Sequence, residues 1–400
     1  RFDRRLKMDL NAIPAPKRGW GNIAVASWCH FVGDFYCNLL PVLLPILALK
    51  FGLSYSQCGL LYMIFQVSAS FLQAPIGIAA DKHNLGILLP VSIITGGVLA
   101  SAVGLCSSAW ILVIIIFLSG ICSSGFHPIA GGMVPIIAPK GKEVLATSLF
   151  IVGGNVGFAI APFITALYLE HFTKEEIIYL AVIPVATTLL LFKRGLYSKP
   201  KPENAAQIIS VKKIVTNKPF LMLVSSIGLR AVCYCSLVIF IPLLYTSKGI
   251  SSVSASSVLM VLLIGTATGG MLVGCISTKF KLKTLIVASY SLTIVMMAIF
   301  LYKADDSLIS YISIFLAGIG LYGATPPAIV WAQKLLPHAD SFATSMMLGF
   351  TFGIGYALSV FVGWLGDYIG LQNSLVIWIF STMILATAII LRVKENALKI

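Results

Sequence analysis

Two ionisable residues, His30 and Asp34, lie four positions apart inside the first long apolar run of the chain. On a helix this spacing places both side chains on one face, with Cβ atoms roughly 5–6 Å apart. A carboxylate inside a bilayer is unfavourable by about 2.5–3.5 kcal/mol on insertion scales and usually marks a solute pathway or a proton relay. We therefore predict that Asp34, with His30 beside it, takes up and releases a proton. The alternative is a structural carboxylate that His30 or the backbone satisfies.

Two further ionisable residues, Arg230 and His127, lie away from the ends of apolar runs. The guanidinium of Arg230 is planar, keeps its charge and suits a carboxylate, phosphate or phosphonate. Arg230 is predicted either to form a permanent ion pair with Asp34 or to bind an anionic solute that replaces Asp34. His127 precedes Pro128, and irregular backbone is tolerated inside a membrane where it is buried in protein or lines a cavity. His127 is a candidate for solute contact, with a buried structural histidine as the alternative.

Small and uncharged polar residues complete the candidate site. Asn155, Gln66 and Gln333 are predicted to contact the solute. A small-residue face for close helix packing is predicted at Gly153, Gly154, Gly157 and Pro162. The eight cysteines fall within or at the ends of apolar runs and show no CxxC or Cys/His ligand spacing. They are expected to be small buried hydrophobic residues, and neither a disulfide nor a metal site is predicted.

Composition indicates a polytopic membrane protein. The 400 residues are 58% hydrophobic and 10% charged, whereas soluble domains carry about 25% charged residues. A membrane-spanning helix needs about 20 apolar residues. Twelve such runs occur, at about 21–49, 57–80, 85–107, 110–137, 144–169, 177–194, 219–246, 254–277, 284–302, 308–333, 342–365 and 373–391. The predicted fold class is therefore all-α, with twelve transmembrane helices.

The net charge of +14 follows the predicted topology and does not indicate a nucleic-acid partner. If the amino terminus is cytoplasmic, 23 of the 28 Lys and Arg residues fall in cytoplasmic segments, four fall outside, and Arg230 lies in the membrane. This distribution fits the positive-inside rule. Both termini are expected in the cytoplasm. No cleavable signal peptide is expected, because the first apolar run is too long for one.

An internal repeat divides the chain into two halves. A shift of about 197 residues aligns 77–82 with 274–279 and 146–148 with 343–345, and slightly larger shifts align two prolines in each half. We predict a cytoplasmic segment at 1–19, a six-helix half at 20–195, a cytoplasmic linker at 196–218, a second half at 219–392 and a tail at 393–400. The repeat places Asp34 and Arg230 at nearly equivalent positions of the two halves.

Several motifs resemble known transporters. Gly77, Asp81 and Lys82 match the loop motif of the major facilitator superfamily, although an ordinary tight turn has the same composition and Thr278 replaces the acid in the second half. Gly157-x-x-x-Ala161-Pro162 resembles, with Ala161 in place of a glycine, the antiporter motif of drug–proton exchangers in that superfamily. Phe126-His127-Pro128, the 148–157 segment, Ala332–Pro337 and Gly349–Gly353 resemble the fosmidomycin-resistance family. This resemblance implies twelve helices, an inner-membrane location and proton-driven export of small, often anionic compounds.

The leading hypothesis is a proton-coupled secondary transporter that works by alternating access, most simply as a solute/proton antiporter. The alternative is a proton symporter that imports a polar anion such as a polycarboxylate or a siderophore. A channel would be expected to show a selectivity signature or a ring of charged residues, and the sequence shows neither. An enzyme would need a nucleophile–base set, and none is visible. A receptor that has lost transport is a further, less favoured class. The predicted partners are the solute, protons and lipid, the protein is expected to act as a monomer, and the proton gradient is the energy source, with no cofactor.

Overall fold

We describe the protein from a computed structural model of residues 16–198, 216–277, 279–336, 343–344 and 346–393. Most of the predicted amino-terminal segment, of the linker and of the tail lies outside these residues, as do Thr278, Pro337 and Ser345. The side chains of Asp81 and Lys82 are likewise outside the described part, so their predicted gating role stays a prediction.

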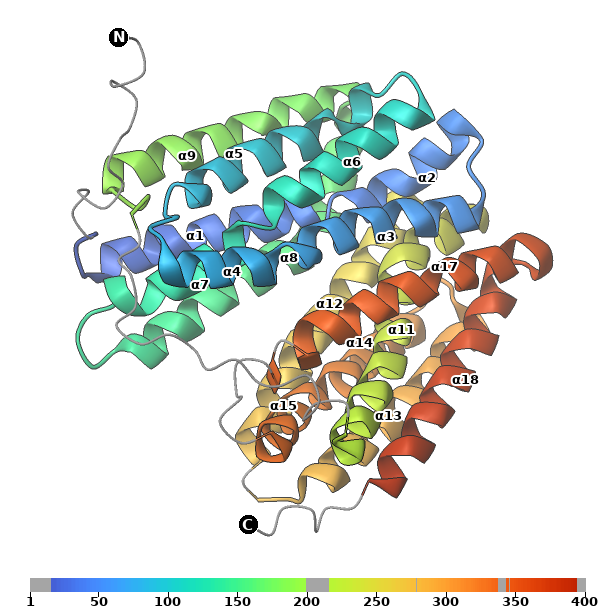
Figure 1. Cartoon of the computed structure of the whole chain (residues 1–400). Helices are drawn as coiled ribbons and strands as arrows, with labels where there is room; N and C mark the ends of the chain where they lie inside the picture. Colours follow the sequence, from blue (N-terminus) through green and yellow to red (C-terminus); the bar gives the residue numbers. More distant parts are fainter. Residues whose placement is uncertain (1–15, 199–215, 278, 337–342, 345, 394–400) are drawn as a thin grey trace. The chain divides into compact units, whose positions relative to one another are not determined.

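The described residues form helices without a strand, and twelve helical segments are long and apolar enough to cross a membrane. This confirms the predicted all-α fold. Each of these membrane-spanning segments is either one continuous helix or two consecutive helical elements (Figure 1). The helices are α1 (Trp20–Cys37), α2 (Leu40–Phe51), α3 (Tyr55–Phe71), α4 (Gln73–Lys82), α5 (Leu88–Ser101), α6 (Ala109–Ser123), α7 (Phe126–Ile137), α8 (Glu143–His171), α9 (Val182–Arg194), α11 (Lys218–Ser247), α12 (Ser252–Ile276), α13 (Leu282–Lys303), α14 (Leu308–Gly323), α15 (Thr325–Leu335), α17 (Thr351–Ile369) and α18 (Leu371–Arg392), with 3₁₀ turns η2 (Ala102–Leu105) and η3 (Glu175–Ala181) and a π-helical turn η4 (Met346–Phe350).

The helices begin and end where the local sequence supplies the required groups. The side chains of Ser108, Asn217, Ser251 and Ser307 accept hydrogen bonds from backbone N–H groups in the first turns of α6, α11, α12 and α14. Such caps satisfy donors that have no partner within the helix. At the other end of α9, Gly195 adopts a left-handed conformation with φ of 70°, which glycine adopts without steric strain.

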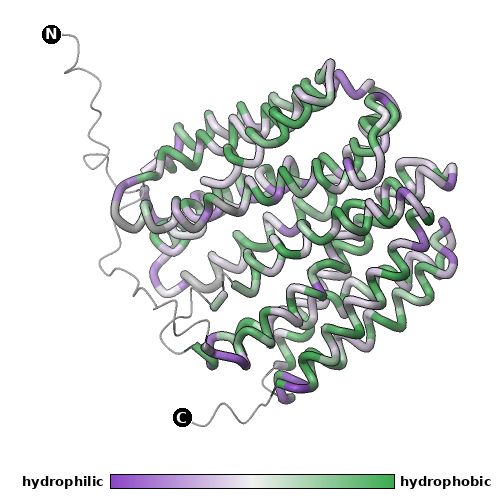
Figure 2. Tube along the Cα trace, turned by 45° about the vertical axis from the view of Figure 1, so that its right-hand side comes forward, coloured by the Kyte–Doolittle hydropathy of each residue, from purple (hydrophilic) through white to green (hydrophobic). Residues whose placement is uncertain are grey.

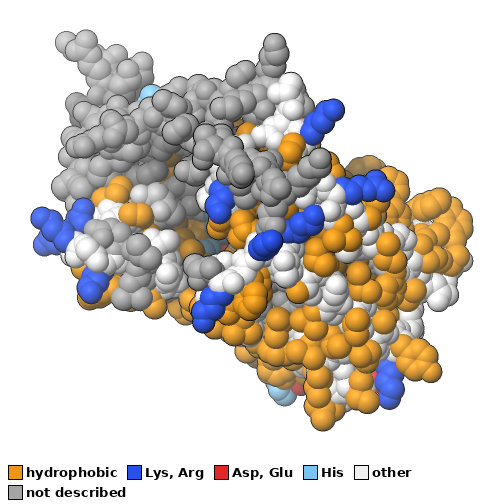
Figure 3. Space-filling model, turned by 90° about the horizontal axis from the view of Figure 1, so that it is seen from below, with side chains coloured by type: hydrophobic (Ala, Val, Ile, Leu, Met, Phe, Trp, Pro, Cys, Tyr) orange, Lys and Arg blue, Asp and Glu red, His pale blue; other side chains and the backbone are white. Residues whose placement is uncertain are grey.

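The outer surface is apolar. Hydrophobic residues run along the helices and hydrophilic ones gather at the loops (Figure 2). Hydrophobic side chains also cover large areas of the face in Figure 3, where Lys and Arg side chains stand at separate points. Leu49 and Tyr302 are more than four-fifths exposed, at 83% and 86%. An apolar surface of this extent suits lipid rather than water, as expected of a multi-pass membrane protein.

Two spans of opposite halves are interrupted at equivalent places. The fourth span breaks before Gly125 and continues as α7, and the tenth breaks at Ala324 and continues as α15. A proline follows each break within the first turn of the new helix, Pro128 in α7 and Pro327 in α15. Because proline has no N–H to donate, it fits the first turn of a helix far better than an interior turn. His127 therefore lies in the first turn of α7.

The chain packs as two compact units. The first contains Arg1–Leu39, Val67–Phe158 and His171–Ala205, and the second contains Leu40–Gln66, Ala159–Glu170 and Ala206–Ile400. In the first unit α1 packs against α5, α7 and α9. In the second, α11 contacts α2, α12, α17 and α18 and is almost completely buried. The domain boundaries predicted from the repeat stay predictions.

Candidate functional site

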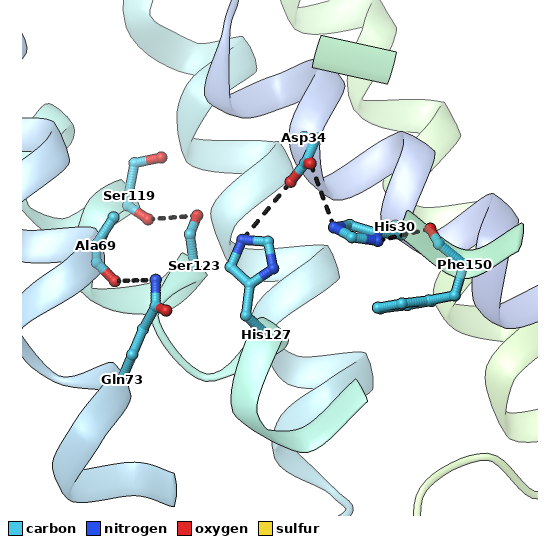
Figure 4. A network of polar contacts seen from close by, with 8 residues as sticks. All are labelled: His30, Asp34, Ala69, Gln73, Ser119, Ser123, His127 and Phe150. Atoms are coloured by element: carbon cyan, nitrogen blue, oxygen red, sulfur yellow. Dashed lines mark hydrogen bonds and ion pairs between the residues drawn. The ribbon is translucent and has the colours of Figure 1, made fainter. Parts of the chain in front are cut away.

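Three ionisable side chains meet in the first unit, two on α1 and one on α7 (Figure 4). Nε2 of His30 lies 3.2 Å from Oδ2 of Asp34. Nε2 of His127 lies 3.6 Å from Oδ1 of the same carboxylate. His30 and Asp34 are largely buried, whereas the side chain of His127 is 40% exposed. Asp34 thus joins two imidazoles that are distant in the sequence. We refer to His30, Asp34 and His127 as the His–Asp–His cluster.

The hydrogen bonds of His30 determine where a proton is held. Its Nδ1 lies 2.8 Å from the backbone carbonyl oxygen of Phe150, and a carbonyl can only accept a hydrogen bond, so Nδ1 carries a hydrogen. An ionised carboxylate also only accepts. The 3.2 Å contact between Nε2 and Asp34 therefore requires a hydrogen on one of the two groups. The pair thus holds one proton between an imidazole and a carboxyl group.

Aromatic rings limit the access of water to His30. The ring of Phe150 stacks on it with centroids 4.1 Å apart, and the ring of Phe126 lies 5.4 Å away in a tilted arrangement. Charge interactions are stronger where surrounding groups exclude water. The Asp34–His30 interaction is therefore stronger here than it would be on a surface.

Close packing of α8 on α1 explains three glycines of the small-residue face. A Cβ at Gly153 would lie 2.5 Å from the backbone oxygen of Ser27, and one at Gly157 would collide with the backbone oxygen of Phe31. A Cβ at Gly154 would instead collide with the imidazole of His30 and lie 2.6 Å from Oδ2 of Asp34.

Three other residues of the predicted site, Asn155, Pro162 and Gly77, lie away from the cluster. Asn155 is exposed and has no hydrogen bond within the described part of the chain. Pro162 lies inside the continuous helix α8. Gly77 lies where α4 meets α7, and a Cβ there would be 3.7 Å from Pro128. The structure therefore places Gly77 in a helix contact and does not bring Asn155 into the cluster.

A small cavity borders the cluster. It has a volume of about 20 Å³ and is lined in part by Asp34, His127, Cys37, Ser92 and Ser123. A site of this size holds about one water molecule when polar groups surround it. The carboxylate of Asp34 therefore has a small cavity, lined by both polar and apolar side chains, on one side and a histidine on each of two others.

Arg230 lies in the second unit, on α11, and its side chain is fully buried. Its Nη1 donates a hydrogen bond of 2.8 Å to the carbonyl oxygen of Leu321, and the rings of Tyr322 and Phe352 lie 5.6 Å from its Cζ. Nε and Nη2 have no hydrogen-bond partner among the described residues. Buried unsatisfied donors are destabilising, and two donors on one edge of a guanidinium match the two oxygens of a carboxylate.

The predicted polar residues Gln66 and Gln333 also lie in the second unit. Nε2 of Gln66 donates to the hydroxyl of Tyr62 at 3.0 Å, and Nε2 of Gln333 donates to Oγ1 of Thr344 at 3.1 Å. Both amides are thus engaged within the protein. Because Asp34 and Arg230 belong to different units, their predicted proximity stays a prediction.

Sequence reasoning missed three contributors to these sites. The carbonyl of Phe150 orients His30, and the rings of Tyr322 and Phe352 enclose Arg230. Phe352 follows the π-helical turn η4, and such turns frequently occur at functional sites. The glycines and phenylalanines of 349–353 marked this segment as unusual in the sequence, but the sequence did not show that Phe352 lies beside Arg230.

Twelve helical segments among the described residues are long and apolar enough to cross a membrane, which defines the class as a polytopic membrane protein. The chain belongs to the Major Facilitator Superfamily, whose family model matches residues 23–360.

Relatives across nearly the whole length are also transporters or named for drug resistance. The chain is 24% identical to the fosmidomycin resistance protein of Escherichia coli (strain K12) over 368 residues, 89% of each chain. It is 27% identical to an uncharacterized MFS-type transporter of Bacillus subtilis (strain 168) over 369 residues, 88% of each chain. It is 22% identical to a sialic acid transporter of Escherichia coli (strain K12) over 365 residues, 88% of this chain and 89% of the relative.

Solved structures share the fold. A bacterial homologue of the human lysosomal transporter Spinster, in an inward-facing and occupied conformation, aligns with a TM-score of 0.75 at 17% identity. The alignment covers 94% of this chain and 97% of the other. This likeness concerns the fold alone.

Proposed function

We propose that this protein is a proton-coupled secondary transporter for a small organic anion, and that it acts by exporting the anion in exchange for protons. The observation that carries the proposal is the His30–Asp34 contact, whose geometry requires a bound proton. Release of that proton would leave a buried carboxylate facing the lone pair of an imidazole, which is unfavourable. Proton release is therefore expected only when a conformational step or a solute changes the surroundings of Asp34.

Arg230 is the proposed anion-binding residue. Its Nε and Nη2 donors lack partners among the described residues, and a carboxylate would accept hydrogen bonds from both. Both atoms are buried in this structure, so an anion can reach them only if side chains around Arg230 move. A sialic acid transporter among the relatives supports an acidic solute. Asn155, Gln66, Gln333 and His127 remain proposed solute contacts.

Export is favoured by the relative named for fosmidomycin resistance and by the glycine-rich face of α8. Import by proton symport is the second candidate, and it is favoured by the relative named for sialic acid transport. Its solute would be a polar anion such as a polycarboxylate or a siderophore. In either case we propose a monomer in the inner membrane with both termini in the cytoplasm. The proton gradient supplies the energy.

The proposal is tested in proteoliposomes with an imposed pH gradient. The probes are sialic acid, fosmidomycin and a neutral drug of similar size, and each is followed in both directions. We expect anion movement that increases with the gradient, and the direction relative to the gradient separates antiport from symport. Anion movement that ignores the gradient would refute proton coupling.

Two variants assign the roles of the residues. Asp34→Asn keeps the size of the side chain but removes its exchangeable charge, so gradient-driven movement should be lost while solute binding persists. Arg230→Lys keeps the charge but loses the fork of donors, so anion affinity should fall. An Arg230→Lys variant with wild-type affinity for every anion would refute the anion site.

A further inference from the structure

The geometry points to a divalent transition-metal site in the His–Asp–His cluster. We propose that His30, Asp34 and His127 together bind an ion of the Zn²⁺ class. The proposal rests on the positions of the ligand atoms, and it does not depend on the proposed transport function. The sequence predicted no metal site, because no Cys/His spacing was visible and the third ligand, His127, comes from another helix.

The ligand atoms have separations close to those of a tetrahedral site. Zinc bonds to histidine nitrogen and carboxylate oxygen are about 2.0–2.2 Å long, which places neighbouring ligand atoms about 3.3 Å apart in a tetrahedron. The observed separations are 3.2 Å from His30 to Asp34 and 3.6 Å from His127 to Asp34. One ligand atom from each residue lies within 4.8 Å of the other two. A small movement of His127, the most exposed member of the cluster, would bring the ligand nitrogens of the two histidines to the separation that a tetrahedral site requires.

The orientation of His30 matches that of a metal ligand. Its Nδ1–H donates to the carbonyl oxygen of Phe150, so Nε2, which points toward Asp34, is the ring nitrogen that can bind a metal ion once the proton shared with Asp34 has left. Histidine ligands almost always donate their second ring N–H to a carbonyl, carboxylate or water, which fixes the tautomer and the ring plane. The partner that a metal ligand needs is thus already present.

The cavity beside the cluster provides the fourth coordination position. Asp34 and His127 line it, and its volume of about 20 Å³ holds one water molecule. Sites with three protein ligands and one water are a common arrangement for zinc. Two histidines and one carboxylate also form the ligand set expected for zinc and cobalt rather than for magnesium or calcium, which prefer oxygen ligands.

A bound metal ion would replace the proton that His30 and Asp34 share. Both protein ligands would then be engaged at Nε2 and at the carboxylate, so the pair could no longer exchange protons. Where the proposed proton coupling is correct, zinc is therefore an inhibitor that acts at the cluster itself.

The binding test uses the metal alone and requires no transport. The full chain is purified in detergent with an affinity tag that contains no histidine and is titrated with Co²⁺, whose visible absorption distinguishes tetrahedral from octahedral coordination. We expect one equivalent of Co²⁺ with a tetrahedral spectrum, displaced by Zn²⁺. His30→Ala and His127→Ala should each weaken binding about 100-fold, since even outer partners of ligands contribute 10–100-fold.

Matched controls use His83 and His171, the two histidines that are exposed among the described residues. His83→Ala and His171→Ala should bind cobalt as the wild type does. An octahedral spectrum, or tetrahedral binding that persists in His30→Ala or His127→Ala, would overturn the site. His127→Ala keeps the test valid if His30→Ala fails to fold, because the His127 side chain is partly exposed. Wild-type protein that couples transport to protons but binds no Co²⁺ would refute the metal site alone. Wild-type protein that binds Co²⁺ at the cluster but transports independently of the pH gradient would refute the coupling alone.

Discussion

Replacement of Gly154 by alanine tests whether α8 positions the proton-holding pair. The added Cβ would lie 2.6 Å from Oδ2 of Asp34 and 2.5 Å from Cδ2 of His30. Ordinary contacts begin at 3.4 Å, so the carboxylate must move by about 0.8 Å, the difference between 3.4 and 2.6 Å. Overpacking of this kind costs about 1–3 kcal/mol. A displacement near 1 Å at a reacting group reduces rates by about 100-fold.

The assay combines thermal unfolding with gradient-driven transport of the anion found in the proteoliposome screen. We expect Gly154→Ala to lower the unfolding midpoint modestly and to lower transport about 100-fold, with an altered pH dependence. Gly153→Ala is the matched comparison, because its Cβ would meet the backbone of α1 at Ser27 rather than the pair. It should destabilise the protein and leave the pH profile unchanged.

Gly131→Ala is the inert control, because among the described residues, apart from its own turn of α7, nothing lies within 4 Å of a Cβ at this position. It should leave transport unchanged and raise stability by up to about 1 kcal/mol, since alanine favours a helix. The reasoning is refuted if Gly154→Ala transports with the wild-type rate and pH profile. Equal changes in pH profile for Gly153→Ala and Gly154→Ala would also refute it, since they would indicate helix separation alone.

Three further changes have expected outcomes. Arg230→Met should raise the unfolding midpoint, because a buried guanidinium whose Nε and Nη2 lack hydrogen-bond partners among the described residues is unfavourable; a lower midpoint would contradict this. Asp367 accepts hydrogen bonds from the first two backbone N–H groups of α3 at 2.7 and 3.1 Å, so Asp367→Ala should destabilise the protein by about 0.5–2 kcal/mol in thermal unfolding, and an unchanged midpoint would refute the cap. Hydrogen bonds from Ser307 and Ser310 lower the pKa of Asp305, in the α13–α14 loop, from 3.8 to about 2, so the ionised carboxylate stabilises the fold above pH 4 and this effect is lost as the pH falls toward 2. Asp305→Asn should therefore lower the unfolding midpoint at pH 6 but not at pH 2, and a difference in midpoint that is independent of pH would exclude this linkage.

Features that depend on local pattern could be predicted from the sequence. Runs of about 20 apolar residues are sufficient to specify membrane spans, because a polar backbone in lipid must satisfy its hydrogen bonds within a helix. The twelve predicted helices follow from this constraint and are present. The contact between His30 and Asp34 is also local, since one helical turn separates the two residues, and the structure has their side chains 3.2 Å apart.

The tertiary structure alone decided which helices bring these residues to their partners. The small residues of α8 indicated close packing, but only the helix crossing shows that Gly154 faces His30 and Asp34. His127 reaches Asp34 because α7 packs on α1, although 93 positions separate the two residues. Helical periodicity describes one helix at a time, and the rotation and crossing of two helices depend on how all their side chains interlock. For that reason the proposed proton site was visible in the sequence as a pair and became a cluster of three only in the folded chain.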